Sequence, residues 1–164
     1  MRIREILTEI GGYLERKVGI PVFVLPADPA EVDATEPPYV GIRFVDARVP
    51  ATISMGNVSG KYVLEEVELR IEVSIYSGPL PEKVMGEIDE ISMKILTAMA
   101  LNSSFEGVSY VGNDEFSDVL VAEESDEALE KIGLIRTIPM NFIGTIEVEL
   151  EEDKTEIIEM EGRI

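Results

Sequence analysis

The clearest pattern in the chain is a strict alternation of apolar and polar residues between positions 67 and 76. Glu, Arg, Ser and Tyr residues occupy the polar positions, and the apolar positions are Val67, Leu69, Ile71, Val73 and Ile75. A period of two predicts a strand with one buried face and one face open to water or to a partner. Such a strand is typical of an open antiparallel sheet that is covered on one side, and not of a doubly wound α/β core.

Two segments carry apolar residues at spacings of three and four, which predicts amphipathic helices. The first covers residues 2–17 and ends before Gly19 and Pro21. The second begins at Pro81, because proline suits the first turn of a helix, and runs to about Leu101. Each helix has one apolar stripe to bury.

Strands are predicted over the remaining apolar runs, at residues 22–25, 39–49, 62–76, 108–111, 119–122 and 134–150. The Pro-rich, acidic residues 26–38 are expected to form a loop, and residues 50–61 a long hairpin tip. Gly144 is predicted to mark a bend or bulge in the last strand. Pro139 in the same strand suggests an edge position or an irregularity.

These elements predict an α+β fold, because two helical stripes and one apolar sheet face can cover each other in two layers. We expect an antiparallel sheet of about four strands, with two helices packed on one face and a long β-hairpin. Residues 1–150 are expected to form a single domain, and residues 151–164 an acidic C-terminal tail.

Composition limits the chemistry that is open to the chain. It has no Cys and no His, so it lacks a thiol nucleophile, a thiolate metal site and the commonest general base. We therefore expect no enzyme, no catalytic residue, no cofactor and no metal requirement. With 14 basic and 33 acidic residues the net charge is −19, which disfavours binding to nucleic acid and to anionic membranes. No apolar run is long enough to span a membrane, so we expect a soluble protein made in the cytoplasm.

Carboxylates offer the one alternative site, since they suit Ca²⁺ or Mg²⁺. Their spacing does not match an EF-hand, and we interpret them as a solvated acidic segment. A small α+β domain that binds a ligand or a divalent metal remains the alternative function. The cluster consists of Asp114, Glu115, Asp118, Glu123, Glu124 and Asp126.

Charged residues of both signs lie in the middle of the predicted strands. We predict that they share one sheet face, where they form either ordinary surface ion pairs or part of a subunit interface. Arginine suits an interface because its planar fork can bind a carboxylate with two hydrogen bonds. The interface candidates are Arg43, Glu68, Arg70, Glu72 and Arg136.

The order of these segments resembles the tail terminator, or tail completion, proteins of long-tailed phages and proviruses. The resemblance covers about residues 2–150 and is one of order and spacing. It depends on the strand that opens with Pro38-Tyr39-Val40, the polar hairpin tip, the strand 67–76, the helix of about twenty residues after it, and the Arg-bearing strand 135–142.

This resemblance implies a structural protein of the virion tail, assembled in the host cytoplasm. Its partners would be further copies of itself in a hexameric ring, the tail-tube protein and head-completion proteins, while DNA at most passes through the ring. An acidic lining would repel phosphate there. A cellular oligomeric interaction module is the remaining alternative. The hairpin tip is the candidate contact to neighbouring tail proteins, through Thr52, Ser54, Met55, Asn57, Ser59 and Lys61.

Overall fold

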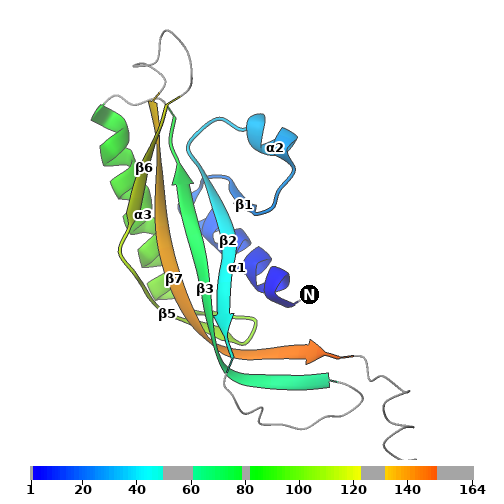
Figure 1. Ribbon diagram of the computed structural model, residues 1–164. Helices are drawn as coiled ribbons and strands as arrows, with labels where there is room; N and C mark the ends of the chain where they lie inside the picture. The colour runs from blue at the N-terminus through cyan, green and yellow to red at the C-terminus, as the bar shows by residue number, and fades with distance from the viewer. Residues whose placement is uncertain (1, 50–60, 79–81, 123–131, 151–164) are drawn as a thin grey trace, which may run out of the picture.

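The computed structural model describes residues 2–49, 61–78, 82–122 and 132–150 (Figure 1). Its helices are α1 (Arg2–Val18), α2 (Pro29–Asp33) and α3 (Glu82–Leu101). Its strands are β1 (Val22–Val24), β2 (Tyr39–Arg48), β3 (Lys61–Tyr76), β4 (Ser104–Phe105), β5 (Val108–Asn113), β6 (Ser117–Ala122) and β7 (Ile132–Glu149).

The strands form one mixed sheet in the order β1-β2-β3-β7-β5-β4, and β6 also pairs with β7. β1 lies parallel to β2, and the other pairs are antiparallel. The prediction of an antiparallel sheet of about four strands with two helices was therefore wrong: the described residues form seven strands and three helices. The strand predicted at residues 22–25 is present as β1, but β4 was missed because two residues cannot display a period.

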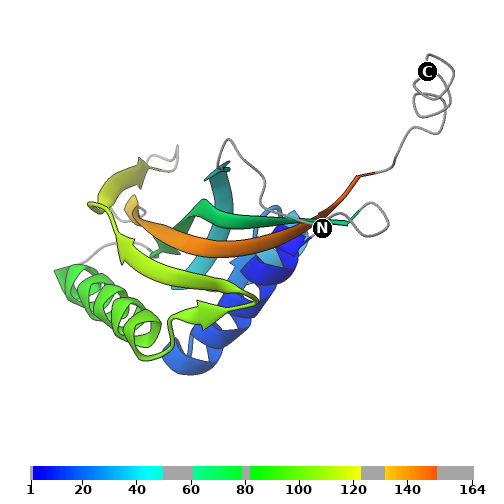
Figure 2. The same cartoon turned by 90° about the horizontal axis from the view of Figure 1, so that it is seen from below.

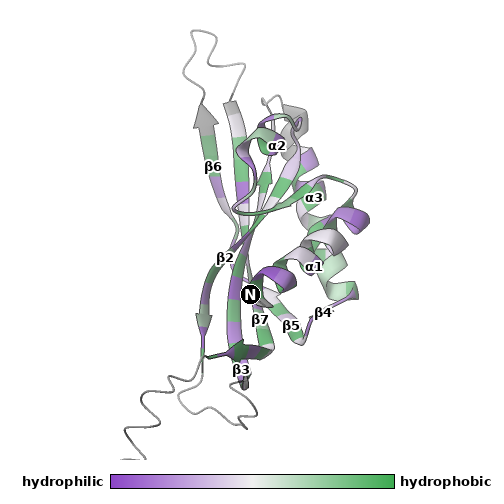
Figure 3. Cartoon of the chain, turned by 90° about the vertical axis from the view of Figure 1, so that its right-hand side faces the viewer, coloured by the Kyte–Doolittle hydropathy of each residue, from purple (hydrophilic) through white to green (hydrophobic). Residues whose placement is uncertain are grey.

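The helices α1 and α3 cover one face of the sheet, and the opposite face is left open (Figure 3). The sheet curves around this helical layer when it is viewed from below (Figure 2). The alternation predicted for residues 67–76 is confirmed, because every apolar residue of this run is buried against the helices. The polar residues between them lie on the open side, which we call the outer face.

The core forms where α1 and α3 pack on the sheet. Gly11 of α1 faces β1 and β2, and a Cβ there would make ordinary contacts of 3.4 Å with Val24 and 3.6 Å with Ile42. Tyr13 links the two helices, because its hydroxyl donates a 2.6 Å hydrogen bond to the carbonyl of Ala98. Its ring also packs against Phe105, with 5.4 Å between the ring centroids. A buried Tyr needs such a partner for its hydroxyl.

β3 and β7 bend together and continue as a two-stranded arm beyond the body of the sheet (Figure 1). The arm consists of residues 61–64 paired with residues 146–149. At the bend a bulge interrupts the register of β3, where Glu66 has a φ of 56°. Gly144 lies opposite this bulge, so its prediction as a bend is confirmed. A Cβ at Gly144 would lie 2.2 Å from the carbonyl oxygen of Gly107.

Two further differences from the sequence expectation have local causes. The acidic loop contains the short helix α2, which Asp28 caps by accepting a 3.0 Å hydrogen bond from the Ala30 amide. Pro139 lies in the central strand β7, where the neighbour on one side changes from β5 to β6. Because proline has no N–H to donate, it fits at this gap between two ladders.

We expect Gly144→Ala to lower the free energy of unfolding by roughly 3 kcal/mol, because the new methyl group meets backbone rather than a movable side chain. Gly86→Ala on α3 is the matched control: nothing lies within 4 Å of its Cβ position, so it should gain about 0.5–1 kcal/mol from helix propensity. Urea denaturation of both variants measures the difference. Equal stability of the two variants would contradict the close approach of Gly144 to the backbone of Gly107.

Candidate functional site

The outer face carries ion pairs that cross neighbouring strands. Arg43 of β2 lies directly opposite Glu72 of β3, and its guanidinium donates a hydrogen bond to the Glu72 carboxylate. On the other side of β3, Ser74 and Thr137 of β7 share a hydrogen bond of 3.0 Å between their hydroxyl oxygens. Arg43 and Glu72 therefore lie on the same sheet face, as the sequence predicted, and the structure shows in addition that they are direct neighbours.

Arg70 is the centre of a second group on the outer face. Its guanidinium donates to Asp114 at 3.0 Å and to the Asn141 side-chain oxygen at 3.5 Å. The Asn141 amide also donates to Asp114 at 3.3 Å, which closes the triangle. The side chains of Arg70 and Asp114 are about half exposed, so we expect this pair to contribute at most about 1 kcal/mol to folding.

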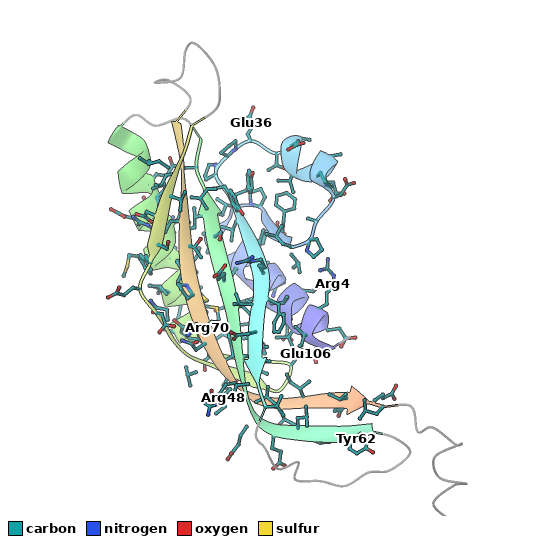
Figure 4. All side chains as sticks on the ribbon, in the orientation of Figure 1. Arg4, Glu36, Arg48, Tyr62, Arg70 and Glu106 are labelled. Atoms are coloured by element: carbon teal, nitrogen blue, oxygen red, sulfur yellow. The ribbon has the colours of Figure 1, made fainter. Side chains whose placement is uncertain are left out.

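A groove of about 690 Å³ lies on the outer face where β2, β3, β5 and β7 meet. Arg48 and Arg70 mark its position near the bend of β3 and β7 (Figure 4). Glu68, another interface candidate, lies opposite Arg48 in the ladder and also lines the groove. The groove combines both signs of charge with apolar side chains; its lining includes Asp46, Arg48, Glu68, Arg70, Val111 and Ile143.

Arg136 does not belong to this group, so the prediction of one shared face was wrong for this residue. It pairs with Ile75, which is fully buried, and therefore points toward the helices. The alternation along β7 indicated the buried face, because Arg136 is two residues from each of the buried residues Leu134 and Ile138. Charge alone had suggested the outer face.

Arg136 is instead 7% exposed and holds three elements together. It donates to both oxygens of Asp118 on β6, at 2.8 and 2.9 Å, and to Asp89 on α3. Ser92 of α3 lies 3.4 Å from the same guanidinium. Phe116 covers it, with 5.5 Å from the Arg136 Cζ to the ring centroid. We call these residues the Arg136 cluster.

Electrostatics in the cluster favour the charged forms of both partners. The hydrogen bonds from Arg136 lower the pKa of Asp118, against a smaller opposing effect of burial. The hydrogen bonds to Asp118 in turn raise the pKa of Arg136 further above its usual range, despite partial burial. The guanidinium therefore stays charged at every pH at which the protein is folded.

The acidic cluster of the sequence analysis is divided in the structure. Asp114 binds Arg70 on the outer face, whereas Asp118 binds Arg136 on the helical face. Glu123, Glu124 and Asp126 lie outside the described residues. Among the residues that the structure places, no group of three or more carboxylates is arranged to hold a metal ion.

Several other predicted features fall outside the described ranges. Residues 50–60, which contain most of the predicted hairpin tip, are among them, and Lys61 is described only as the first residue of β3. The acidic tail, residues 151–164, is another. None of the described helices is both long and apolar enough to cross a membrane.

Two exposed strand edges were not predicted from the sequence. β1 pairs with β2 only at residues 40–42, so no described strand covers the outer edge of residues 43–48. β6 pairs with β7 alone among the described strands. Apolar side chains at both edges are exposed to solvent: Phe44 and Val45, with Val49 just after β2, at the first edge, and Val119 and Leu120, with Phe116 just before β6, at the second. The local pattern gave no sign of this exposure, because it does not show where a neighbouring strand ends.

Comparison with known proteins adds no further constraint, since neither a protein-family model nor a curated protein matches the chain.

We expect Arg136→Met to lower the free energy of unfolding by about 2–3 kcal/mol, because it leaves Ser92 and two carboxylates without their shared donor. Arg70→Met is the matched control on the outer face and should cost about 1 kcal/mol or less. Chemical denaturation measures both. Equal losses would show that burial does not distinguish the two arginines.

The lowered pKa of Asp118 predicts a pH dependence with a defined sign. Its folded-state pKa lies below the unfolded value of about 3.9, so the stabilisation is fully present above that value and is lost as the pH falls through the folded-state pKa. We expect Asp118→Asn to be less stable than the parent at pH 7 and to lose less stability on acidification. Melting curves between pH 7 and pH 3 measure this. Parallel curves for the two proteins would contradict it.

Proposed function

We propose that the protein is a structural assembly subunit, specifically a tail terminator or tail completion protein of a phage-like particle. The arm formed by β3 and β7 carries this proposal, because it extends a pair of strands beyond the helical layer (Figure 1). An arm of this kind presents backbone and side chains to neighbouring subunits without weakening the core.

The outer face supports the same proposal. It carries hydrogen-bonded charges and a groove of about 690 Å³, and no described helix covers it (Figure 3). Interfaces that form between folded subunits are commonly mixed in polarity, with arginine enriched among their residues. Arg43, Glu68, Arg70 and Glu72 remain the interface candidates on this face, whereas Arg136 is assigned to the interior.

The net charge of −19 supports a role beside DNA rather than on it. A ring that lets DNA pass must not bind phosphate tightly, and an acidic surface repels it. We therefore propose partners of three kinds: further copies of the chain in a hexameric ring, the tail-tube protein and head-completion proteins. The action requires no cofactor and no catalysis.

The carboxylate-metal alternative has less support, because Asp114 and Asp118 are used by arginines on opposite faces. A cellular oligomeric module would use the same outer face and edges as the proposed tail protein. The two functions differ in one respect: only a tail terminator acts on the length of a tail tube.

We expect addition of the purified protein to polymerising tail-tube subunits to stop tube growth and to allow heads to join. A deletion of residues 52–59 should keep the melting temperature, since it leaves the described core intact, and should abolish joining. Electron microscopy of tube lengths and joined particles measures both. Joining by the deletion variant would exclude the hairpin tip as the contact, and tubes that grow unchanged with the intact protein would leave the cellular module as the function.

A further inference from the structure

The two-residue turn between β4 and β5 is held at the base of the arm. Glu106 and Gly107 form this turn, and their φ angles are both positive, at 42° and 87°. The carbonyl of Gly107 accepts a 3.1 Å hydrogen bond from the amide of Thr145, the residue of β7 just before the arm. Gly107 also lies against Gly144, which has no side chain to separate the two backbones. A shift of this turn would therefore move the strand that enters the arm.

Glu106 is an unusual residue for this turn. A two-residue hairpin turn with two positive φ angles favours Asn, Asp or Gly at its first position, because other side chains crowd the backbone there. The backbone therefore gives no reason for a glutamate. The side chain instead meets α1, where its carboxyl group is hydrogen-bonded to that of Glu9. Figure 4 shows Glu106 near the base of the arm.

A buried aromatic contact positions these two carboxyl groups. Phe105, the residue before Glu106, is buried and packs against the ring of Tyr13. Tyr13 lies four residues after Glu9 and therefore shares its side of α1. The aromatic pair aligns α1 with the turn, and the carboxyl groups of Glu9 and Glu106 meet at the exposed rim of this contact.

Two carboxyl groups can share a hydrogen bond only when one of them carries a proton. Burial raises the pKa of Glu9 above its usual value, and the charge and the hydrogen bond of Glu106 raise it further. When both groups are ionised, they repel each other instead. The contact between α1 and the turn therefore depends on one proton.

The surroundings of the pair do not remove this repulsion. The guanidinium of Arg16 extends back along α1 to Gly12, so it attenuates the repulsion, but the pKa of Glu9 is still raised. Arg4 is bound to the carbonyls of Leu25 and Pro26. The charged residues on the elements around the pair are Arg4, Glu5 and Arg16 on α1, Glu66 on β3 and Glu147 on β7.

We propose that Glu9 and Glu106 form a pH-sensitive contact that ties α1 to the base of the arm. A shared proton closes the contact, and loss of that proton replaces attraction by repulsion and loosens the turn from α1. Because the turn is bonded to Thr145, the contact also restrains the strand that leads into the arm. The inference concerns the conformation of the arm and does not depend on the proposed function.

The raised pKa of Glu9 sets the sign of the pH dependence. The stabilisation is fully present below the unfolded-state value of about 4.3 and is lost as the pH rises through the folded-state pKa. Asp118 acts in the opposite direction, because its contribution is lost on acidification. A melting curve adds the two effects together, so the contact must be measured locally, at the arm.

Amide hydrogen exchange at Thr145 gives this local measurement. We expect the protection factor of its amide to rise by roughly threefold between pH 7 and pH 4, within the range of interactions between exposed charged groups. Glu106→Gln should reach the higher protection already at pH 7, because an amide donates to the Glu9 carboxylate without an added proton. Glu5→Gln is the matched control, since it removes one negative charge from the same helix and should keep the parent's response.

Two further measurements separate the carboxyl pair from other titrating groups. Asp118→Asn should keep the Thr145 response, because the Arg136 cluster lies apart from the turn. Carboxyl carbon shifts measured by NMR should show that Glu9 titrates at a higher pH than Glu5. Melting temperatures at pH 7 that match or exceed the parent's show that the Glu106→Gln and Glu5→Gln variants are folded.

Three results would overturn the inference. The first is a Thr145 protection factor that stays constant or falls when the parent protein is acidified. The second is a response that persists in Glu106→Gln, because the proton would then act elsewhere. The third is a response that Glu5→Gln also loses, because that would show a general effect of net charge rather than a contact between two carboxyl groups.

Discussion

The antiparallel pairing of β3 with β7 is the interaction on which the rest of the sheet depends. β2 joins the sheet through β3, and β1 joins through β2, while β5 and β6 both pair with β7. The two central strands come from distant parts of the sequence, so their pairing must overcome the entropy of closing a long loop. Once formed, it fixes the buried face, the outer face and the direction of the arm.

Residues with a strong period could be placed from the sequence, and residues without one could not. The alternation in β3 and the apolar stripes of α1 and α3 gave their position and their buried faces. β4 escaped detection because its existence depends on a tight turn at Glu106 and Gly107, both of which have positive φ. The parallel pairing of β1 with β2 is set by the packing of α1 on both strands, which a local pattern does not contain.

The candidate site shows the same division. Arg43 and Glu72 were placed correctly on one face, because the alternation along each strand fixes the face of a side chain, whereas their direct pairing depends on a register that the sequence does not show. Arg136 was assigned to the outer face because of its charge, although its position in the alternation of β7 indicated the interior. Its contacts with Asp89 and Ser92 join distant parts of the sequence, so they are visible only in the structure. The open edges of β2 and β6 depend on which strands end where, and that is a property of the whole sheet.

The Arg136 cluster connects an exposed edge of the sheet to the helical layer. Asp118 belongs to β6, whereas Asp89 belongs to α3 and has a side chain that is 64% exposed. A cation that binds Asp89 from solvent competes with the Arg136 guanidinium for this carboxylate and removes one of the contacts that orient the guanidinium toward β6. Because coupling between two sites is reciprocal, an event that fixes β6 favours the contact between Arg136 and Asp89 over binding of such a cation. The surface of α3 and the edge of the sheet are thus thermodynamically linked through one cation.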